Sequence, residues 1–584
     1  MFTSSLRCLK KSDLFGFLLK INRPKRQFIR YASSVIDCHL PNINIPSLTI
    51  PEFIFQKFSK YPHKTALECA ETGRKYTFEE VRRKSINLNK ALRKKFNVKR
   101  NDIVAIVLPN IPEYAICILG SLQAGLRVTT VNPFGTTEEV KSQILDTDAK
   151  VIFTTCQLGE FIENVVKQLP KRFPIVTIKT EMPDTIPQGT VNFQELIDTV
   201  CDINDTDICS TNDIAVIPYS SGTTGKQKGV LHSHNTLIAS VCVINCDQLY
   251  PIKETTENLQ ETTPAVLPFF HIYGLSVVLL LQLYNLVNII TIPRFTPTIF
   301  LDSLLKYKPT TMCVVPPIVL LMANHPSVKK DHFESLEIIY SGAAPLGASD
   351  EHKLIQRSEK DLNIYQGYGL TEAPVVTAFY KNTVIPHGSV GRAIQNTHLK
   401  VVPVENPKAD HLGFNEPGEL LVKGSQVMLG YYNRPKETED AFIDGWFRTG
   451  DLVYVDEENN MFVKDRLKEL IKVKAYQVAP AELEELIRTY PNVSDAVVIG
   501  IPHEQYGEVP RAYLTIKGDT KVNVKHLEEF IASKVAKYKR IIGGFAIVDS
   551  IPKTASGKYL RKDLKLQYMQ ELKTLNGKYR CTQI

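Results

Sequence analysis

From about residue 50, the chain alternates between amphipathic segments with the period of a helix and short, continuously apolar runs. The amphipathic segments include 78–96 and 113–124, and the apolar runs include 103–108 and 151–154. Short apolar runs are typical of strands buried on both faces, and their alternation with helices indicates parallel sheets covered by helices. The pattern therefore predicts an α/β fold.

Three further strands are expected at 215–217, 311–315 and 336–340, each followed by glycine, proline and serine residues that favour turns. In α/β sheets, the loops at the carboxyl ends of the strands are the usual ligand site. We therefore expect the functional residues of this chain in the segments that follow these strands.

The longest apolar run, 273–292, invites comparison with a membrane-spanning helix. Gln282, Asn285 and Asn288 interrupt it, which a span of the bilayer core disfavours. A buried helix followed by a strand at 287–292 accounts better for the pattern, so we expect no transmembrane segment.

The pattern changes at 465–468, Asp-Arg-Leu-Lys, where the chain becomes charged and poor in apolar residues. Beyond this point it predicts helices at 481–489 and 525–537 and strands at 496–501 and 511–516.

A chain of 584 residues exceeds what one core usually organises, so we expect more than one domain. The boundary suggested by the charged segment gives a large N-terminal domain over 37–465, a hinge at 466–468 and a small C-terminal domain over 469–584.

The formal net charge of +8 is concentrated at one end, because residues 1–36 contain eight basic residues and one acid. The remainder is close to neutral, which removes the main support for nucleic-acid binding. A basic, hydroxylated, acid-poor segment with an apolar face is typical of a mitochondrial transit peptide, so we expect a matrix location with 1–36 as the leader. The alternative is a basic tail on a cytosolic enzyme, and the C-terminal residues 581–584 lack a peroxisomal address.

Eleven cysteines are scattered without a Cys-x-x-Cys pair, which indicates neither a disulfide scaffold nor a zinc site. Cys242 and Cys246 are four residues apart and are expected to share one face of a helix.

The segment 219–230 reads Tyr-Ser-Ser-Gly-Thr-Thr-Gly-Lys-Gln-Lys-Gly-Val and directly follows the predicted strand at 215–217. Glycines, hydroxyls and lysines at the end of a strand offer backbone N–H groups, donors and positive charge to one small volume, as a nucleotide phosphate requires. It is not a Walker A motif, because Gly222 and Gly225 are separated by two residues and Lys226 precedes Gln227. The segment predicts a nucleotide-binding loop of another type.

Four further segments follow in order: Ser-Gly-Ala-Ala-Pro-Leu-Gly at 341–347, Tyr-Gln-Gly-Tyr-Gly-Leu-Thr-Glu at 365–372, Gly-Trp-Phe-Arg-Thr-Gly-Asp-Leu at 445–452 and Pro-Lys-Thr-Ala-Ser-Gly-Lys at 552–558. Together with the loop they resemble the adenylate-forming superfamily of acyl-CoA synthetases, 4-coumarate CoA ligases and beetle luciferases, over roughly residues 40 to 570. The resemblance implies a large N-terminal domain and a smaller, mobile α+β C-terminal domain. It also implies formation of acyl-AMP from ATP and a carboxylic acid, with pyrophosphate released, followed by transfer to CoA with AMP released.

The resemblance also implies roles for individual residues. The catalytic residues are Lys228, His271, Thr371 and Lys558, and Glu372 would hold Mg²⁺ as the metal cofactor. ATP would be bound by Ser220, Ser221, Gly222, Thr223, Thr224, Gly225, Gly342, Ala343, Ala344, Gln366, Gly367, Tyr368, Asp451 and Arg466. An ionised carboxylate such as Asp451 suits the ribose hydroxyls, because it only accepts hydrogen bonds.

For the CoA step, the resemblance implies a hinge at Lys468 and a hairpin of Lys472, Lys474, Ala475, Tyr476 and Gln477. Ala475 departs from the pattern, because the family usually has a glycine there. The acyl pocket would include Tyr273, Gly274, Ser276, Tyr340 and Ser341, and its aromatic character suits a hydrophobic acid. Medium- or long-chain fatty acids and aryl-propenoic, coumarate-like acids remain open as substrates, and we expect a monomer or weak dimer.

Two other functions stay open at this level: a luciferase-like oxygenase that uses the adenylate, and a binding protein that has lost catalysis. The binding protein is disfavoured because the residues that the resemblance assigns to catalysis and ATP binding are retained, among them Lys228, Thr371, Glu372, Asp451, Arg466 and Lys558.

Overall fold

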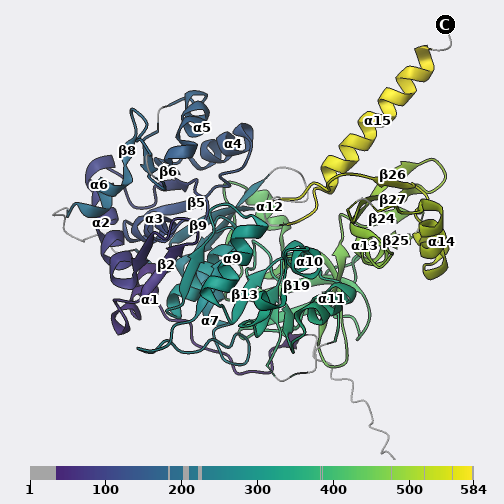
Figure 1. Cartoon of the computed structure of the whole chain (residues 1–584), viewed down its shortest axis with the longest axis horizontal. Helices are drawn as coiled ribbons and strands as arrows, with labels where there is room; N and C mark the ends of the chain where they lie inside the picture. The colour runs from purple at the N-terminus through teal and green to yellow at the C-terminus, as the bar shows by residue number, and fades with distance from the viewer. Residues whose placement is uncertain are drawn as a thin grey trace, which may run out of the picture. The chain divides into compact units, whose positions relative to one another are not determined.

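The computed structural model describes residues 35–171, 173–181, 184–200, 209–220, 227–381, 383, 386–474, 476–518, 520–554 and 557–581, with side chains to residue 572 (Figure 1). The predicted transit peptide up to residue 34, the loop residues 221–226, Ala475 and the last three residues lie outside this description.

The largest sheet has eight strands in the order β20-β10-β9-β5-β4-β6-β7-β8. Neighbours from β9 to β8 are parallel, whereas β10 and β20 are antiparallel additions at one edge. The strands are β4 (Ile103–Ile106), β5 (Arg127–Thr130), β6 (Val151–Thr155), β7 (Ile175–Ile178), β8 (Val191–Asn192), β9 (Ile214–Ser220), β10 (Lys228–Ser233) and β20 (Gly430–Tyr431). The parallel sheet predicted from the apolar runs is confirmed.

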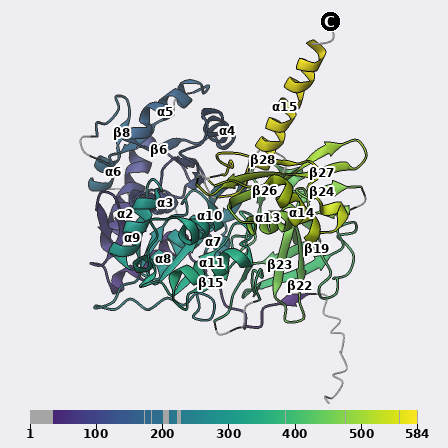
Figure 2. The same cartoon turned by 45° about the vertical axis from the view of Figure 1, so that its right-hand side comes forward.

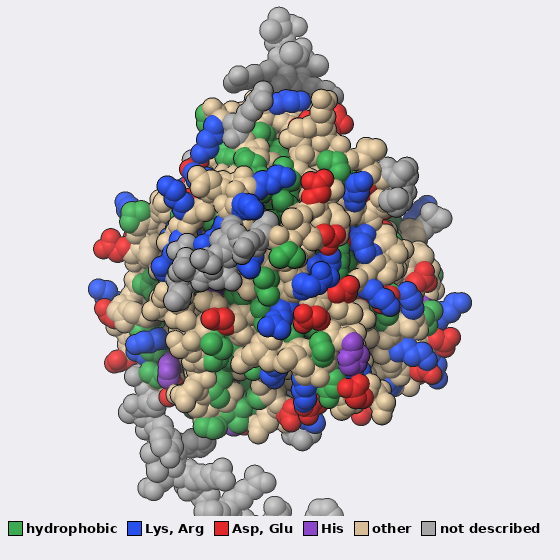
Figure 3. All heavy atoms as spheres, turned by 90° about the vertical axis from the view of Figure 1, so that its left-hand side faces the viewer, with side chains coloured by type: hydrophobic (Ala, Val, Ile, Leu, Met, Phe, Trp, Pro, Cys, Tyr) green, Lys and Arg blue, Asp and Glu red, His purple; other side chains and the backbone are tan. Residues whose placement is uncertain are grey.

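Helices cover both faces of this sheet, as its fully buried strands require. Val104 belongs to the core beneath α2 and α3, whereas Ile103 belongs to a second core beneath α4 and α5, because successive side chains of a strand point to opposite faces. The helices are α2 (Phe78–Phe96), α3 (Glu113–Gln123), α4 (Thr137–Thr147), α5 (Cys156–Lys167) and α6 (Phe193–Asp198). On the face shown in Figure 3, acidic and basic side chains are interspersed rather than gathered by sign.

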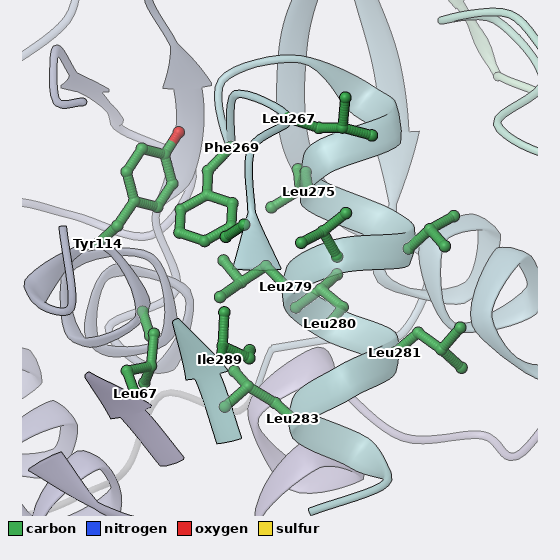
Figure 4. Close-up of a cluster of buried hydrophobic side chains, with 14 of the residues drawn as sticks. Leu67, Tyr114, Leu267, Phe269, Leu275, Leu279, Leu280, Leu281, Leu283 and Ile289 are labelled. Atoms are coloured by element: carbon green, nitrogen blue, oxygen red, sulfur yellow. The ribbon is translucent and has the colours of Figure 1, made fainter. Parts of the chain in front are cut away.

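The apolar run at 273–292 forms a π-helical turn, η2 (Gly274–Leu280), continued by α8 (Leu281–Tyr284) and the strand β12 (Asn288–Thr291). Figure 4 shows leucines of this helix beside Ile289 of β12 and Leu67 of β2, so the run is buried in the protein core as predicted. The sheet has the order β11-β12-β2-β3, with β11 (Thr262–Ala265), β2 (Thr65–Cys69) and β3 (Lys75–Thr77). Among the described helices, none has the length and apolar character that crossing a membrane demands.

A third, three-stranded parallel sheet contains β13 (Thr311–Val314), β14 (Ile338–Ser341) and β15 (Asn363–Gln366). Its carboxyl ends lead into the two segments at 341–347 and 365–372. Because adjacent parallel strands end at one edge, this sheet brings the two segments together. The helices α9 (Pro297–Tyr307), α10 (Pro316–Asn324) and α11 (Ala348–Ser358) accompany it.

An antiparallel sheet of six strands was not predicted from the sequence. Its order is β1-β18-β19-β22-β21, with β23 also paired to β22. The strands are β1 (Ile36–Asp37), β18 (Thr397–Val402), β19 (Gly418–Gly424), β21 (Phe442–Ile443), β22 (Trp446–Val455) and β23 (Met461–Arg466). Several of these strands alternate buried and partly exposed positions, a weaker sequence signal than a continuous apolar run.

The C-terminal residues form a separate sheet with its own core, and its elements lie together in both Figure 1 and Figure 2. The strands are β24 (Ile471–Val473), β25 (Tyr476–Val478), β26 (Val493–His503), β27 (Gly507–Ile516) and β28 (Phe545–Ile547). The predicted helices correspond to α13 (Pro480–Arg488) and α14 (Val524–Lys534), and α15 spans Arg561–Cys581. An α+β unit therefore follows the charged segment, as expected.

The remaining elements are α1 (Ile50–Phe55), η1 (Phe58–Lys60), α7 (His234–Cys242), η3 (Lys330–Phe333), β16 (Thr377–Ala378), β17 (Arg392–Ala393), α12 (Pro435–Asp440) and η4 (Lys537–Lys539). The prediction that Cys242 and Cys246 share a helix face is wrong. Helix α7 ends at Cys242, and the Asn245 N–H bonds the Cys242 carbonyl in a turn that carries Cys246 out of the helix.

Candidate active site

The five sequence segments converge on one region. An open cleft of about 1370 Å³ is lined by residues of all five, including Lys228, Ala343, Tyr368, Asp451 and Lys558. An adjoining cleft of about 890 Å³ shares some of these residues and adds further members of the predicted site: Ser220, His271, Thr371 and Glu372. Segments up to 338 residues apart in the sequence, from Ser220 to Lys558, therefore face common space.

Asp451 lies on β22 opposite Arg466 of β23, where the two strands pair. The carboxylate is buried, with 3% of the residue exposed. Its Oδ2 accepts a 2.5 Å hydrogen bond from the Tyr368 hydroxyl, and its Oδ1 lies 3.4 Å from Arg466 Nε. Burial raises the pKa of this carboxyl, and the Arg466 charge opposes that shift. Oδ1 has no hydrogen-bond partner among the described residues, so an acceptor remains available beside the cleft.

The turn at 342–344 is held in a constrained form. A Cβ on Gly342 would lie 3.2 Å from the ring of Tyr273, and Ala343 has a φ of +69°. The Gln366 amide hydrogen-bonds both backbone groups of Leu346 at 3.0 Å and donates to Glu351 at 2.6 Å. The side chain of Gln366 is thus committed to fixing the loop, and the backbone of Gly367 lies along the cleft.

Glu372 lies beside Ser220, the last residue of β9. Its Oε1 accepts 3.0 Å hydrogen bonds from the hydroxyls of Ser220 and Tyr431. The Lys228 ammonium lies 4.8 Å from the centre of the Tyr431 ring. Tyr431 was not identified from the sequence, because it lies in the short edge strand β20 outside the five segments.

Thr371 is positioned through its backbone by a histidine that the sequence analysis also missed. His232 Nε2 lies 2.7 Å from the Thr371 carbonyl oxygen. Burial lowers the pKa of His232 to about 4, so the ring is neutral at physiological pH and donates its Nε2 proton to that carbonyl.

Lys558 and His271 meet at the inner end of the site. Burial and the nearby Arg466 charge lower the pKa of Lys558 to about 8, while Glu372 and Asp451 oppose the shift. Burial and the Lys558 charge lower the pKa of His271 to about 3. The Tyr273 backbone N–H donates to His271 Nδ1 at 3.3 Å, so the neutral ring carries its proton on Nε2. The inner end of the site therefore contains one cation, Lys558, and one neutral N–H donor, His271.

A small cavity of about 80 Å³ opens beside Lys558 and His271, and its wall combines aromatic side chains with aliphatic and small residues. Tyr340 stacks on Tyr250 with ring centres 4.4 Å apart, and burial raises the pKa of both hydroxyls. Of the predicted acyl-pocket residues, Tyr273, Tyr340 and Ser341 line this cavity.

The other two predicted pocket residues serve the packing around the cavity. The Ser276 hydroxyl lies 2.7 Å from that of Ser240 in the core. A Cβ on Gly274 would lie 2.1 Å from the Pro268 carbonyl oxygen, so only glycine permits this close approach of the backbone.

The structure does not bring the predicted thioester residues into the clefts. Lys468 lines the second cleft, but Lys472, Lys474, Tyr476 and Gln477 are exposed on the β24–β25 hairpin. Tyr476 stacks on Tyr538 with ring centres 4.2 Å apart. In this arrangement Lys553, Thr554 and Lys558 line both clefts.

Known proteins with similar sequences and structures are consistent with this geometry. The family model described as AMP-binding enzyme matches residues 54–432, and that described as AMP-binding enzyme C-terminal domain matches residues 482–558. The chain is 35% identical over 545 residues to the probable 4-coumarate–CoA ligase 1 of Dictyostelium discoideum, covering 90% of this chain and 96% of the relative. It is 35% identical over 544 residues to 4-coumarate–CoA ligase 1 of Arabidopsis thaliana, covering 90% and 94%.

Solved structures show the same fold. ATP-bound MatB from Rhodopseudomonas palustris is similar with a TM-score of 0.78 at 24% identity, covering 89% of this chain and 99% of that one. The anthranilate CoA ligase AuaEII in complex with anthranoyl-AMP gives a TM-score of 0.79 at 22% identity, covering 90% and 98%. The chain therefore belongs to the AMP-binding enzyme family, and it is an adenylate-forming enzyme of the acid–CoA ligase class.

Proposed function

We propose that this enzyme activates a compact hydrophobic carboxylic acid as its adenylate and transfers the acyl group to CoA, with Lys558 as the central catalytic residue of the first step. The observation that carries this proposal is the position of Lys558, which lines both clefts and the small aromatic cavity. A cation at that junction can contact an acid in the cavity and a nucleotide phosphate in the cleft at the same time.

The acid carboxylate would lie between Lys558 and the Nε2–H of His271, with its hydrocarbon part in the cavity. Attack on the α-phosphorus of ATP brings two anions together, so positioning and positive charge dominate catalysis. Lys558 would stabilise the charge that develops on the phosphoryl oxygens, and neutral His271 would orient the carboxylate by donating its Nε2–H to it. Lys228 and the Thr371 hydroxyl would hold the leaving phosphates.

The nucleoside would lie over the 342–344 turn, with Tyr368 beside the base and Asp451 accepting from the ribose hydroxyls. Both described hydrogen bonds to the Glu372 carboxylate fall on Oε1, which leaves Oε2 for a metal ion. A single carboxylate, together with phosphates and water, is a ligand set that suits Mg²⁺. When bound, Mg²⁺ would neutralise charge on the phosphoryl oxygens. We also propose that Lys468 is the hinge of the C-terminal domain. The hairpin beyond it would form part of the thioester site.

The acid is expected to be compact. The cavity of about 80 Å³ is smaller than the apolar cavity of about 150 Å³ that holds benzene in another protein. The cavity must widen to admit any acid. A long acyl chain would also require displacement of the stacked rings of Tyr250 and Tyr340. Aryl and medium-chain acids therefore fit better than long-chain acids, and the curated relatives named as 4-coumarate–CoA ligases support this choice.

The proposal is tested by supplying ATP, CoA and a graded series of acids. We expect acid-dependent AMP and acyl-CoA, with kcat/KM highest for aryl-propenoic or medium-chain acids and lower for long-chain fatty acids. Omitting CoA should leave ATP–pyrophosphate exchange intact. Production of ADP would contradict adenylation, and oxygen consumption without acyl-CoA would favour the luciferase-like alternative.

A pH profile tests the role of the Lys558 charge. The pKa of about 8 in the free enzyme means that the catalytic cation is lost as the pH rises through that value. Since kcat/KM reports ionisations of the free enzyme, kcat/KM for adenylation should fall above about pH 8. Bound phosphates raise the pKa of the lysine, so kcat should be retained to higher pH. A kcat/KM profile that stays level from pH 7 to about pH 10 would contradict this assignment.

A further inference from the structure

Lys558 lies at the end of a tight loop whose two ends are paired. Lys553 and Tyr559 form an antiparallel bridge. Within the loop, the Thr554 N–H donates to the Lys558 carbonyl at 2.8 Å, and the Lys558 N–H donates to the Thr554 hydroxyl at 3.0 Å. The position of the lysine backbone therefore depends on how this bridge is held.

Asp495 of β26 contacts both residues of the bridge. Its Oδ2 accepts a 2.6 Å hydrogen bond from the Lys553 ammonium, and its Oδ1 accepts a 2.6 Å hydrogen bond from the Tyr559 hydroxyl. The Asp495 side chain is only 13% exposed, and its Oδ1 also accepts the Ala496 N–H at 2.8 Å. Charge-assisted hydrogen bonds of this length are among the stronger ones in proteins, and here one carboxylate fixes both ends of the loop.

The position of the Lys558 backbone is also tied to its neighbour Tyr559. Tyr559 packs on a core cluster of the C-terminal sheet that includes Val497 and Tyr513. Lys558 directly precedes Tyr559, so fixing Tyr559 against that core limits how far the Lys558 backbone can move. Lys558 lines both clefts, of which the first contains Asp451 and the second Glu372.

We propose that Asp495 is a positioning residue for adenylation, which holds the bridge of Lys553 and Tyr559 and thereby places Lys558 at the reacting groups. This inference rests on the proposed role of Lys558. It predicts that Asp495 matters only for the half-reaction that uses the lysine, although Asp495 itself does not line either cleft.

The test separates the two half-reactions in the variant Asp495→Asn. Asparagine keeps an acceptor for the Tyr559 hydroxyl but presents an NH₂ group to the Lys553 ammonium, so two donors face each other and that contact is lost. Misplacement of a catalytic group by about 1 Å can cost on the order of 100-fold, so we expect ATP–pyrophosphate exchange to fall roughly 10- to 100-fold. Conversion of supplied acyl-AMP and CoA to thioester should stay at the wild-type rate. Tyr559→Phe, which removes the other contact, should show the same selectivity.

Ser494→Ala is the matched control, because the Ser494 hydroxyl on the same strand pairs with that of Thr515 at 2.7 Å and has no hydrogen bond to the described residues of the loop. Hydrogen exchange of the 552–560 peptide should be faster in Asp495→Asn than in the wild type or the control. Equal loss of both half-reactions in a folded variant, or loss of neither, overturns the inference. If both Asp495→Asn and Lys558→Ala leave adenylation intact, the proposed function of Lys558 fails as well. If Lys558→Ala loses adenylation but Asp495→Asn does not, only the role of Asp495 is refuted.

Discussion

Replacing Lys558 with alanine is expected to abolish adenylation while leaving the thioester step largely intact. The lysine is the cation that lines the acid cavity and both clefts, so its removal leaves the incoming carboxylate and the phosphate without the charge between them. Loss of one preorganised electrostatic donor typically lowers kcat about 100- to 1,000-fold. ATP–pyrophosphate exchange measures this step directly, since it does not require CoA.

Supplied acyl-AMP bypasses the step that needs Lys558, and its conversion to thioester by Lys558→Ala should continue at a rate close to that of the wild type. Lys565→Ala is a suitable control, because Lys565 lies on α15 in an exposed pair with Glu508, 3.7 Å apart. Equal loss of both half-reactions in a correctly folded Lys558→Ala protein would show that the lysine serves the structure instead of the first step.

Several elements of the fold follow from local sequence. Helix α2 begins and ends as predicted because Thr77 and Glu80 form a capping box and Asn97 ends the helix in a left-handed conformation. The buried strands of the parallel sheets were recognisable as apolar runs. The six-stranded antiparallel sheet was not, because several of its strands alternate buried and partly exposed positions and its edge strand β1 pairs far along the chain, Ile36 with Leu399.

The same contrast between local and long-range signals applies to the residues of the site. Each of the five segments contributes residues that face the clefts, and these could be recognised because turn chemistry and charge are local properties. Tyr431 and His232 were missed because each acts through a partner in another segment, Glu372 and the Thr371 carbonyl. The position of the 472–477 hairpin could not be predicted from local sequence either, because it depends on how the C-terminal sheet is placed.

Replacing Asp451 with asparagine is expected to weaken ATP binding strongly. The carboxylate is buried, bonded by Tyr368 and close to Arg466, and its Oδ1 is the acceptor without a partner among the described residues. Asparagine offers a single acceptor oxygen, which the Tyr368 hydroxyl would compete for, and it leaves Arg466 without its carboxylate. Hydrogen bonds to charged groups contribute about 1.5–3 kcal/mol, so kcat/KM for ATP should fall roughly 10- to 100-fold.

Deoxynucleotides separate a direct ribose contact from a general loss of structure. The wild-type enzyme should discriminate against 2′-deoxy-ATP or 3′-deoxy-ATP, because the analogue leaves the Asp451 acceptor unpaired. In Asp451→Asn this discrimination should shrink, which is the coupling that a double-mutant cycle measures. Asp456→Asn in the same β22–β23 hairpin is the control, since the Asp456 carboxylate accepts only from Glu458 and Asn460 of the turn among the hydrogen bonds described. If Asp451→Asn retains full discrimination between ATP and both deoxynucleotides, Asp451 does not bind the ribose, and the nucleoside must lie elsewhere in the cleft.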